Sequence, residues 1–223
     1  MTGKKAVVPK FSSNMFRGGR CPPTQHMKLF KSDQPNTFHY VTAVTFKRVP
    51  VFRSEYACQL LVDSLAETRS HCAFKLIGYV VMPDHVHVIL NPLRKSISEV
   101  VRRLKSLSAR RILDWLRQDS YEASLKKLAL DIPQSRSHTH ALWQKGFSAI
   151  DLWSPRFILQ KLSYVHLNPI RAGLCGHPAE WTWSSYNAYS PHERGGVPIE
   201  IDLGGYWSEA ELASVKTAGN ARL

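Results

Sequence analysis

Two histidines separated by one residue are the first side chains whose types and spacing indicate chemistry. His85 and His87 lie within residues 79–90, a strongly apolar run interrupted near its middle by Pro83 and Asp84. In a β-strand, side chains alternate between faces, so both imidazoles project from one face. Histidine is the commonest metal ligand, and the pair can therefore share a metal ion. The simpler alternative is two core histidines, each hydrogen-bonded to a neighbour.

A second candidate group lies in a helical pattern farther along the chain. Tyr164 and Asn168 are four residues apart, so they share a helix face. The carbonyl oxygen of Asn168 is a candidate third ligand, with Tyr164 one turn earlier. His166 points elsewhere, and we interpret it as a capping or packing residue. The alternative for Tyr164 is an amphipathic core tyrosine.

The charge of the chain indicates the kind of partner. Thirty Lys and Arg residues against seventeen Asp and Glu give a net charge of +13. This predicts a polyanionic partner, most often nucleic acid. An anionic membrane surface would favour a basic amphipathic terminal helix, and neither terminus offers a convincing one. No apolar run is long enough to span a bilayer, and we expect no secretory signal or membrane association.

The cysteines indicate the compartment. The four cysteines are scattered without a Cys-x-x-Cys pair, which argues against a zinc knuckle or a disulfide framework. This usage is typical of a reducing cytoplasm, where we expect the protein to reside.

The length of 223 residues favours one domain with extensions. Residues 1–36 are rich in Lys, Arg, Gly, Pro and Ser, which predicts a flexible basic arm. We assign residues 37–190 to the main domain. Residues 191–223 form a C-terminal extension with little signal.

Hydrophobic periodicity predicts an α+β fold. The expected strands are residues 39–46, 74–81, 85–91 and 141–147, and the expected helices are residues 55–70, a long helix after Ser96, and residues 154–167. Pro83-Asp84 marks a hairpin turn, and we favour a turn role for Asp84 over an extra charge near a metal. Residues 119–139 are polar and irregular, and Asn168-Pro169 is expected to end the last helix. The first six elements match the ferredoxin-like βαββαβ order, an antiparallel sheet with helices on one face, followed by a C-terminal helix carrying the tyrosine. The strand with both histidines would be central.

The polar face of the long helix carries almost only positive charges. Ser96 followed by Glu99 predicts a capping box at its start. Between its apolar residues lie Arg102, Arg103, Lys105, Arg110, Arg111 and Arg117. Because acidic partners are sparse, this face is predicted to bind phosphates. The candidates for nucleic-acid contact are Arg102, Arg103, Lys105, Arg110 and Arg111, together with Lys161 and Arg171 on the tyrosine helix.

Four motifs in this order resemble those of a known family. VMPDHVHVIL (residues 81–90) followed by YVHLNPIRAGL (residues 164–174) looks like the REP-associated tyrosine transposases. These are relatives of the insertion-sequence-200-like single-tyrosine transposases, within the HUH endonuclease superfamily. The linking LWQKGF (residues 142–147) and the trailing WTWSSY (residues 181–186) are also similar, and WTWSSY is expected to pack back on the body. The resemblance covers about residues 39–186.

The resemblance implies a metal-dependent DNA strand transferase of a bacterial cytoplasm, associated with the nucleoid. It implies Mg²⁺ or Mn²⁺ held by His85, His87 and Asn168, with Tyr164 as the nucleophile that forms a 5′-phosphotyrosine. The implied substrate is single-stranded or hairpin DNA, and the implied state is a monomer or a homodimer that exchanges the tyrosine helix. Asp84 departs from the pattern, because Asn is expected before the histidine pair.

Two other functions stay open. One is a non-catalytic, domesticated protein that binds DNA or RNA hairpins on the same scaffold. The other is a metal hydrolase with an activated water, whose turnover would survive the loss of the tyrosine.

Overall fold

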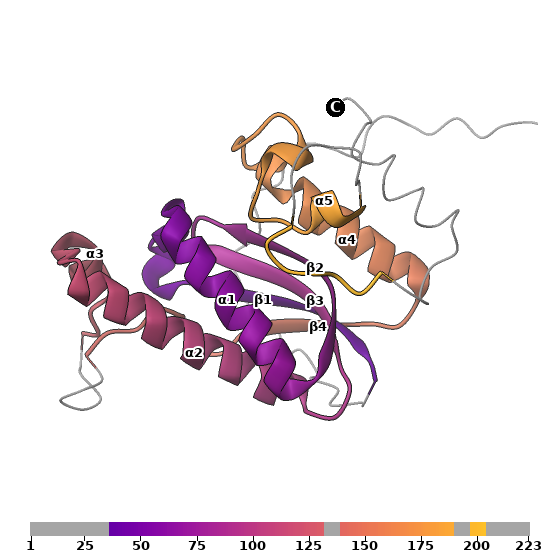
Figure 1. Cartoon of the computed structure of the whole chain (residues 1–223), viewed down its shortest axis with the longest axis horizontal. Coiled ribbons are helices and arrows are strands. Elements are labelled where there is room, and N and C mark those ends of the chain that lie inside the picture. Colours follow the sequence, from indigo (N-terminus) through magenta and orange to yellow (C-terminus); the bar gives the residue numbers. More distant parts are fainter. Residues whose placement is uncertain (1–35, 132–138, 190–196, 204–223) are drawn as a thin grey trace, which may run out of the picture.

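A four-stranded antiparallel sheet carries the histidine pair at its centre. The computed structural model describes residues 36–131, 139–189 and 197–203 (Figure 1). The predicted basic arm therefore lies, apart from residue 36, outside the described residues. The strands are β1 (Phe38–Val44), β2 (Phe74–Met82), β3 (His85–Pro92) and β4 (Ser148–Leu152), in the spatial order β2-β3-β1-β4. β3 is thus an inner strand, as predicted.

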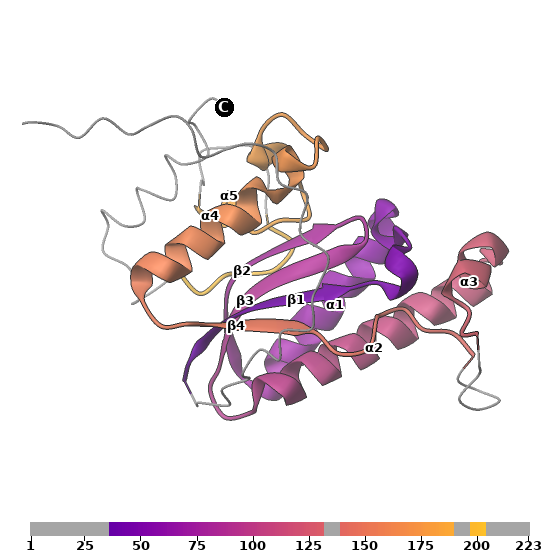
Figure 2. The same cartoon turned by 180° about the vertical axis from the view of Figure 1, so that it is seen from behind.

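Helices cover both faces of this sheet. The helices are α1 (Glu55–Cys72), α2 (Ile97–Gln118), α3 (Glu122–Leu128), α4 (Pro155–Arg171) and α5 (Tyr186–Tyr189), with short 3₁₀ turns η1 (Phe46–Arg48), η2 (Val51–Arg53) and η3 (Pro178–Glu180). α1 and α2 pack together on one face, and α4 crosses the other (Figures 1 and 2). The class is α+β, as predicted. In the described ranges, no helix is both long enough and apolar enough to cross a bilayer.

Two elements between α2 and α4 differ from the prediction. Residues 119–139, expected to be irregular, contain the helix α3, which buries Leu125 and Leu128. The last strand was expected at residues 141–147, but it begins at Ser148. The expected stretch does meet the end of β1, where the Gln144 N–H donates to the Val44 carbonyl at 2.9 Å. Gly146, with φ of 75°, then redirects the chain, so regular pairing starts only after it.

The helix α4 continues beyond the residue at which we expected it to end. Pro169 lies inside its last turn, and the helix ends at Arg171. Proline removes one N–H donor, and in the last turn this costs the helix only a single bond. The N–H groups of Ala172 and Leu174 donate to the carbonyls of Asn168 and Pro169 at 3.0 Å and 2.9 Å. The prediction that Asn168-Pro169 ends the helix was therefore wrong.

The start of α2 agrees with the sequence prediction. The Ser96 side chain accepts from the Glu99 N–H at 3.1 Å, which confirms the N-cap half of the predicted capping box. The Glu99 carboxylate pairs with Lys95 at 2.9 Å. The helix then buries an apolar stripe against α1, which leaves its basic residues toward the outside of this layer.

The strand register places both histidines on the face that α4 covers. His87 lies opposite Thr42 of β1 and Val80 of β2, and His85 lies opposite Val44 and Met82. Residues that are directly opposite in antiparallel strands share a face. Because β3 alternates, Val86 and its even-numbered neighbours face α1 and α2 instead.

Gly78 of β2 lets α4 approach this face closely. A Cβ atom at this position would lie 2.5 Å from Leu162 Cδ1, a distance that real side chains do not adopt. Leu162 itself is fully buried. The glycine therefore determines how near the sheet α4 can lie, and with it the height of Tyr164 over β3.

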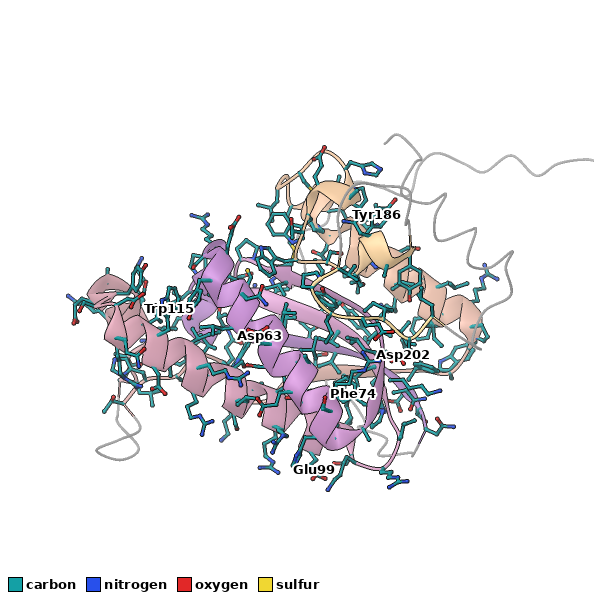
Figure 3. The ribbon with its side chains drawn as sticks, viewed as in Figure 1. Asp63, Phe74, Glu99, Trp115, Tyr186 and Asp202 are labelled. Carbon is teal, nitrogen blue, oxygen red and sulfur yellow. The ribbon has the colours of Figure 1, made fainter. Side chains whose placement is uncertain are left out.

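The chain after α4 covers the outer edge of β2. The Val81 N–H donates to the Trp183 carbonyl at 2.8 Å, and the Tyr189 hydroxyl donates to the Ile77 carbonyl at 2.6 Å. The predicted packing of residues 181–186 against the body is thus confirmed. Asp202 lies near Phe74 at the start of the strand (Figure 3), where its N–H donates to the Leu76 carbonyl at 2.9 Å. An edge strand covered in this way cannot pair with another chain.

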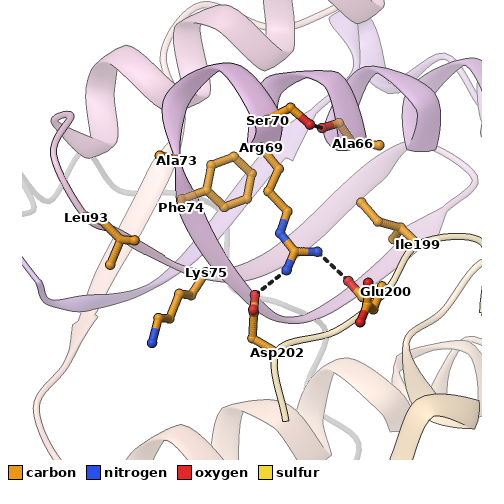
Figure 4. Close-up of a pocket in the computed structure, with 10 residues that line it drawn as sticks. All are labelled: Ala66, Arg69, Ser70, Ala73, Phe74, Lys75, Leu93, Ile199, Glu200 and Asp202. Atoms are coloured by element: carbon orange, nitrogen blue, oxygen red, sulfur yellow. Dashed lines mark hydrogen bonds and ion pairs between the residues drawn. The ribbon is translucent and has the colours of Figure 1, made fainter. Parts of the chain in front are cut away.

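Arg69 of α1 holds the last described segment in place. Its guanidinium donates to the Glu200 carbonyl and to the Asp202 carboxylate, each at 2.6 Å (Figure 4). A cavity of about 460 Å³ lies beside this contact. The Asp202 carboxylate beside this cavity also accepts from the Leu76 N–H, so it links the last described segment to β2.

Candidate active site

His87 is a buried imidazole with one nitrogen already in use. Its side chain is 5% exposed, and its Nδ1 lies 2.7 Å from the Tyr40 hydroxyl and 2.8 Å from the Thr42 hydroxyl. The next nearest contact, from the Tyr40 oxygen to Nε2, is 3.5 Å long. Burial, with a smaller contribution from His85, lowers the pKa of His87 to about 3. The ring is therefore neutral near pH 7, the form that binds metals, and Nε2 is the nitrogen left to do so.

His85 is also held through its Nδ1, but by a carboxylate. Asp84 Oδ1 lies 2.6 Å from His85 Nδ1, and Asp84 Oδ2 accepts from Arg48 at 2.9 Å. Burial raises the pKa of Asp84, but the hydrogen bonds from His85 and Arg48 outweigh this, and the pKa is lowered. The expectation that this side chain mainly serves the hairpin turn was wrong. The turn is stabilised through the Asp84 backbone carbonyl instead, which accepts from the Thr45 N–H.

Tyr164 lies against His87 of its own chain. Its ring centroid lies 5.8 Å from that of His87, in an edge-on arrangement, and the two histidine rings are 4.8 Å apart. Tyr164 is 37% exposed to solvent. This exposure excludes the alternative of a core tyrosine, because the side chain can be reached from solvent.

Two cations flank Tyr164. Lys161 Nζ lies 5.8 Å from its ring centroid and 5.2 Å from that of Tyr40. The Arg171 guanidinium lies 5.2 Å from the Tyr164 ring centroid. Such cations are attracted by the ring faces and also by anionic oxygens at the same place.

Asn168 follows Tyr164 by one turn of α4. Its amide Nδ2 is buried and makes no hydrogen bond within the described part of the chain. A buried amide of this kind is rare unless something else satisfies it. Two imidazole nitrogens and an amide oxygen form a donor set that suits several divalent cations. Among the described residues, no cluster of three or more His, Cys, Asp and Glu side chains offers another metal site.

His166 packs away from the site, as predicted. It is 2% exposed, and its Nε2 lies 2.9 Å from the Ser185 hydroxyl. It therefore joins α4 to the segment that covers the edge of β2.

The predicted phosphate contacts divide between the two faces of the sheet. Lys161 and Arg171 lie at Tyr164, whereas the five candidates of α2 lie in the layer beyond the opposite face. Lys105 donates to the carbonyls of Gln144, at 2.7 Å, and Gly146. Arg111 pairs with Glu67 at 2.5 Å. These two therefore also serve the fold.

The other three candidates of α2 differ in exposure. Arg102 and Arg110 are exposed, while Arg103 is half-buried. Arg110 lines a groove of about 490 Å³ between α2 and residues 140–144. His140 and Trp143 also line this groove, although the sequence analysis did not select them.

Sequence reasoning also missed Tyr40, Thr42 and Arg48. A signal existed for the first two, since they alternate on the predicted first strand and so share one face. Pairing that strand with the histidine strand would have placed them beside His87. Arg48 carries no such signal, because it follows the strand in a turn.

The fold and the site agree with one class of protein, the DNA transposases. Residues 35–171 match the model of the family described as Transposase IS200 like, which is more than half of the chain. The chain belongs to this family, and the resemblance seen in the four motifs is confirmed.

Two relatives extend this result. A candidate REP-associated tyrosine transposase of Haemophilus influenzae is 19% identical over 167 residues, which cover 72% of this chain and 88% of that protein. Among solved structures, a REP-associated tyrosine transposase bound to a REP hairpin is 16% identical, with a TM-score of 0.55. The match covers 80% of this chain and 97% of the other, and it shows the shared fold.

Proposed function

We propose that this transposase cleaves and rejoins single strands of hairpin-forming DNA, with Tyr164 as the nucleophile. The observation that carries the proposal is the exposed Tyr164 ring set edge-on to His87, at 5.8 Å between centroids. A core tyrosine would be buried, and a merely structural histidine pair would not need such a neighbour.

The chemistry follows from the side chains around Tyr164. The Tyr164 hydroxyl gives up its proton as its oxygen attacks the phosphorus, the bond to the 3′ oxygen breaks, and the departing 3′ oxygen takes up a proton, so no proton is gained or lost overall. The product is a 5′-phosphotyrosine, which a 3′-hydroxyl can attack in the reverse direction. Lys161 and Arg171, which lie near the Tyr164 ring, would hold the phosphate oxygens during both steps.

We propose His85, His87 and Asn168 as the holders of a divalent cation, Mg²⁺ or Mn²⁺. Such a cation would polarise the phosphoryl oxygens and orient the phosphate. The Nδ1 atoms of both histidines already have closer partners, so each ring would bind the cation through Nε2, and Asn168 would bind it through its amide oxygen.

The proposed partner is DNA that is partly single-stranded and partly paired. The chain carries a net charge of +13, and a relative of the same fold is bound to a REP hairpin. The scissile strand would lie at α4, and the groove beside Arg110 offers further phosphate contacts. Since Tyr164 meets His87 within one chain, we propose that a monomer suffices for cleavage.

The test uses a labelled library of hairpin oligonucleotides with Mg²⁺ or Mn²⁺, resolved on denaturing gels. We expect a protein-linked band that requires the metal and disappears in Tyr164→Phe, while hairpin binding remains. Tyr56→Phe is the matched control, because Tyr56 is an exposed tyrosine of α1. An adduct that persists in Tyr164→Phe contradicts the proposal.

The same gels separate the two alternative functions. Retention of the hairpin without metal and without any covalent band would indicate a non-catalytic binding protein. Turnover of small phosphate esters that survives Tyr164→Phe would indicate a metal hydrolase.

A further inference from the structure

The hairpin turn before His85 carries an ion pair that reaches the imidazole. Asp84 bridges two donors, with Oδ2 2.9 Å from Arg48 Nη1 and Oδ1 2.6 Å from His85 Nδ1. We propose that Arg48 and Asp84 are positioning residues, which hold His85 with its proton on Nδ1 and leave Nε2 free to bind the cation. The inference rests on the metal site of the proposed function.

Hydrogen-bond chemistry determines the position of the proton. A guanidinium can only donate, and a carboxylate can only accept, so the Nδ1 of His85 must be the donor to Asp84. A neutral imidazole has a single N–H, and its other nitrogen then carries a free lone pair. A carboxylate behind a metal-binding histidine also raises the basicity of that ligand and fixes the direction of its ring.

The turn that carries Asp84 is itself firmly held. The Thr45 N–H donates to the Asp84 carbonyl at 2.9 Å, and the Thr45 hydroxyl lies 2.9 Å from the same oxygen. The Phe52 N–H donates to the Pro83 carbonyl at 3.0 Å. Residues on both sides of Arg48 are thus anchored to the turn, which keeps the ion pair in register with His85.

A strained backbone presents Arg48 to this turn. Lys47 and Arg48 have φ angles of 50° and 53°. These lie in the left-handed region of backbone conformation, which residues other than glycine rarely adopt. Such strain persists only where the surrounding structure over-determines it, and it clusters at functional sites. The Lys47 side chain pairs instead with Asp131 at 2.9 Å. Of these two residues, only Arg48 contacts Asp84, the partner of His85. Substitution of Lys47 is therefore a matched control for substitution of Arg48.

The two histidines are held differently, although both use Nδ1. His87 contacts the neutral hydroxyls of Tyr40 and Thr42, whereas His85 contacts a carboxylate. A hydroxyl can donate or accept, so these contacts alone do not dictate the position of the His87 proton. Only the Asp84 contact imposes one tautomer, which makes the inference specific to His85.

The first measurement is made on the wild-type protein, so it does not depend on a variant whose turn could be destabilised. Long-range ¹⁵N–¹H spectra of the metal-free wild type report which nitrogen of each imidazole is protonated, and His85→Gln identifies the signal of His85. We expect a protonated Nδ1 and an unprotonated Nε2. A protonated Nε2 in the wild type overturns the inference.

The second measurement is Mn²⁺ affinity by electron paramagnetic resonance. Asp84→Ala should weaken binding roughly ten- to hundred-fold, the usual effect of losing a partner of a metal-binding histidine. Asp84→Asn keeps an accepting oxygen but not the charge, so its Mn²⁺ affinity should fall less than that of Asp84→Ala. Arg48→Gln should also lose less Mn²⁺ affinity than Asp84→Ala. Lys47→Gln should bind like the wild type.

The outcomes distinguish this inference from the proposed function. If Asp84→Ala binds Mn²⁺ as tightly as the wild type, the positioning role is overturned while strand cleavage stands. If the wild type binds no Mn²⁺, the inference falls together with the metal site, whatever the covalent band shows.

Discussion

At the scale of single residues, the Nδ1 atoms of both histidines of β3 have hydrogen-bond partners. The Nδ1 of His87 is shared by two hydroxyls of β1, at 2.7 Å from Tyr40 and 2.8 Å from Thr42. Tyr40 also stacks on His87 and lies edge-on to Tyr164. Tyr40 therefore packs against both His87, a proposed metal ligand, and Tyr164, the proposed nucleophile.

This sharing predicts a non-additive effect of two conservative changes. Tyr40→Phe or Thr42→Val alone leaves one hydroxyl on Nδ1, so each should cost little. The double variant leaves a buried nitrogen unpaired, which should lower the free energy of unfolding by about 1–3 kcal/mol beyond the sum. Urea denaturation measures this. An additive double variant would show that the two hydroxyls act independently.

A second prediction concerns pH and His166. Burial lowers its pKa from 6.5 to about 3 in the folded protein. Between these values the unfolded chain binds the extra proton, so stability is present above about pH 6.5 and is lost as the pH falls toward 3. The loss from this residue between pH 7 and pH 5 should be on the order of 2 kcal/mol.

The measurement is urea denaturation at both pH values. His166→Gln keeps a partner for Ser185 but cannot titrate, and it should lose less stability on acidification than the wild type. An unchanged pH dependence would assign the acid sensitivity to other groups, such as the buried His87.

At the scale of elements, the site depends on how closely α4 packs on β2. Gly78 leaves room for Leu162, and the same face carries the histidines. The chain after α4 then follows the edge of β2, where Trp183 and Ser185 bond to its backbone. The position of α4 thus depends on its close approach to the sheet at Gly78 and on the segment after it, which is hydrogen-bonded to the edge of β2.

Gly78→Ala should therefore displace the helix. The added methyl group would meet Leu162, and overpacking of this kind should destabilise the protein by about 1–3 kcal/mol. We expect the yield of the covalent adduct to fall at temperatures where the variant remains folded. Gel assays and denaturation curves measure the two effects.

Two companion variants make this test specific. Adding Leu162→Val removes the contacting carbon and should restore part of both losses. Gly176→Ala is the control, because a Cβ there would make only ordinary contacts at 3.7 Å or more. A fully active Gly78→Ala would show that α4 tolerates a shift without losing the site.

At the scale of the whole molecule, positive charge lies on both sides of the sheet. Lys161 and Arg171 lie beside Tyr164, the proposed nucleophile, and Arg102 and Arg110 are exposed on α2. The first pair can act on the reacting phosphate, whereas the second can act only on flanking phosphates. Affinity and cleavage should therefore respond to different residues.

Arg102→Gln with Arg110→Gln should weaken hairpin binding and make it less sensitive to salt. Each lost phosphate contact should reduce the slope of log affinity against log salt by about one. Cleavage at saturating DNA should remain, whereas Lys161→Gln should slow it. Binding titrations at several salt concentrations and single-turnover gels measure these effects.

The control for this charge change is Lys127→Gln. Lys127 is exposed on α3, outside the groove beside Arg110. An equal change in slope from Lys127→Gln would indicate a general effect of net charge rather than contacts at α2.

Short-range patterns in the sequence determined much of the site. Period two places His85 and His87 on one face, and helical spacing places Tyr164 and Asn168 on another. The order of the motifs also identified the family. These inferences hold because each depends on residues within a single element.

Only the tertiary structure decided what surrounds those residues. Tyr40 reaches His87 across 47 positions of sequence, and Arg48 reaches Asp84 across 36. Such contacts depend on strand register and on a strained turn, which no local pattern specifies. The continuation of α4 past Pro169 also depends on tertiary packing, because Pro169 is buried in the folded protein. Spacing along the chain thus selects the reacting groups, and packing between distant segments places their partners.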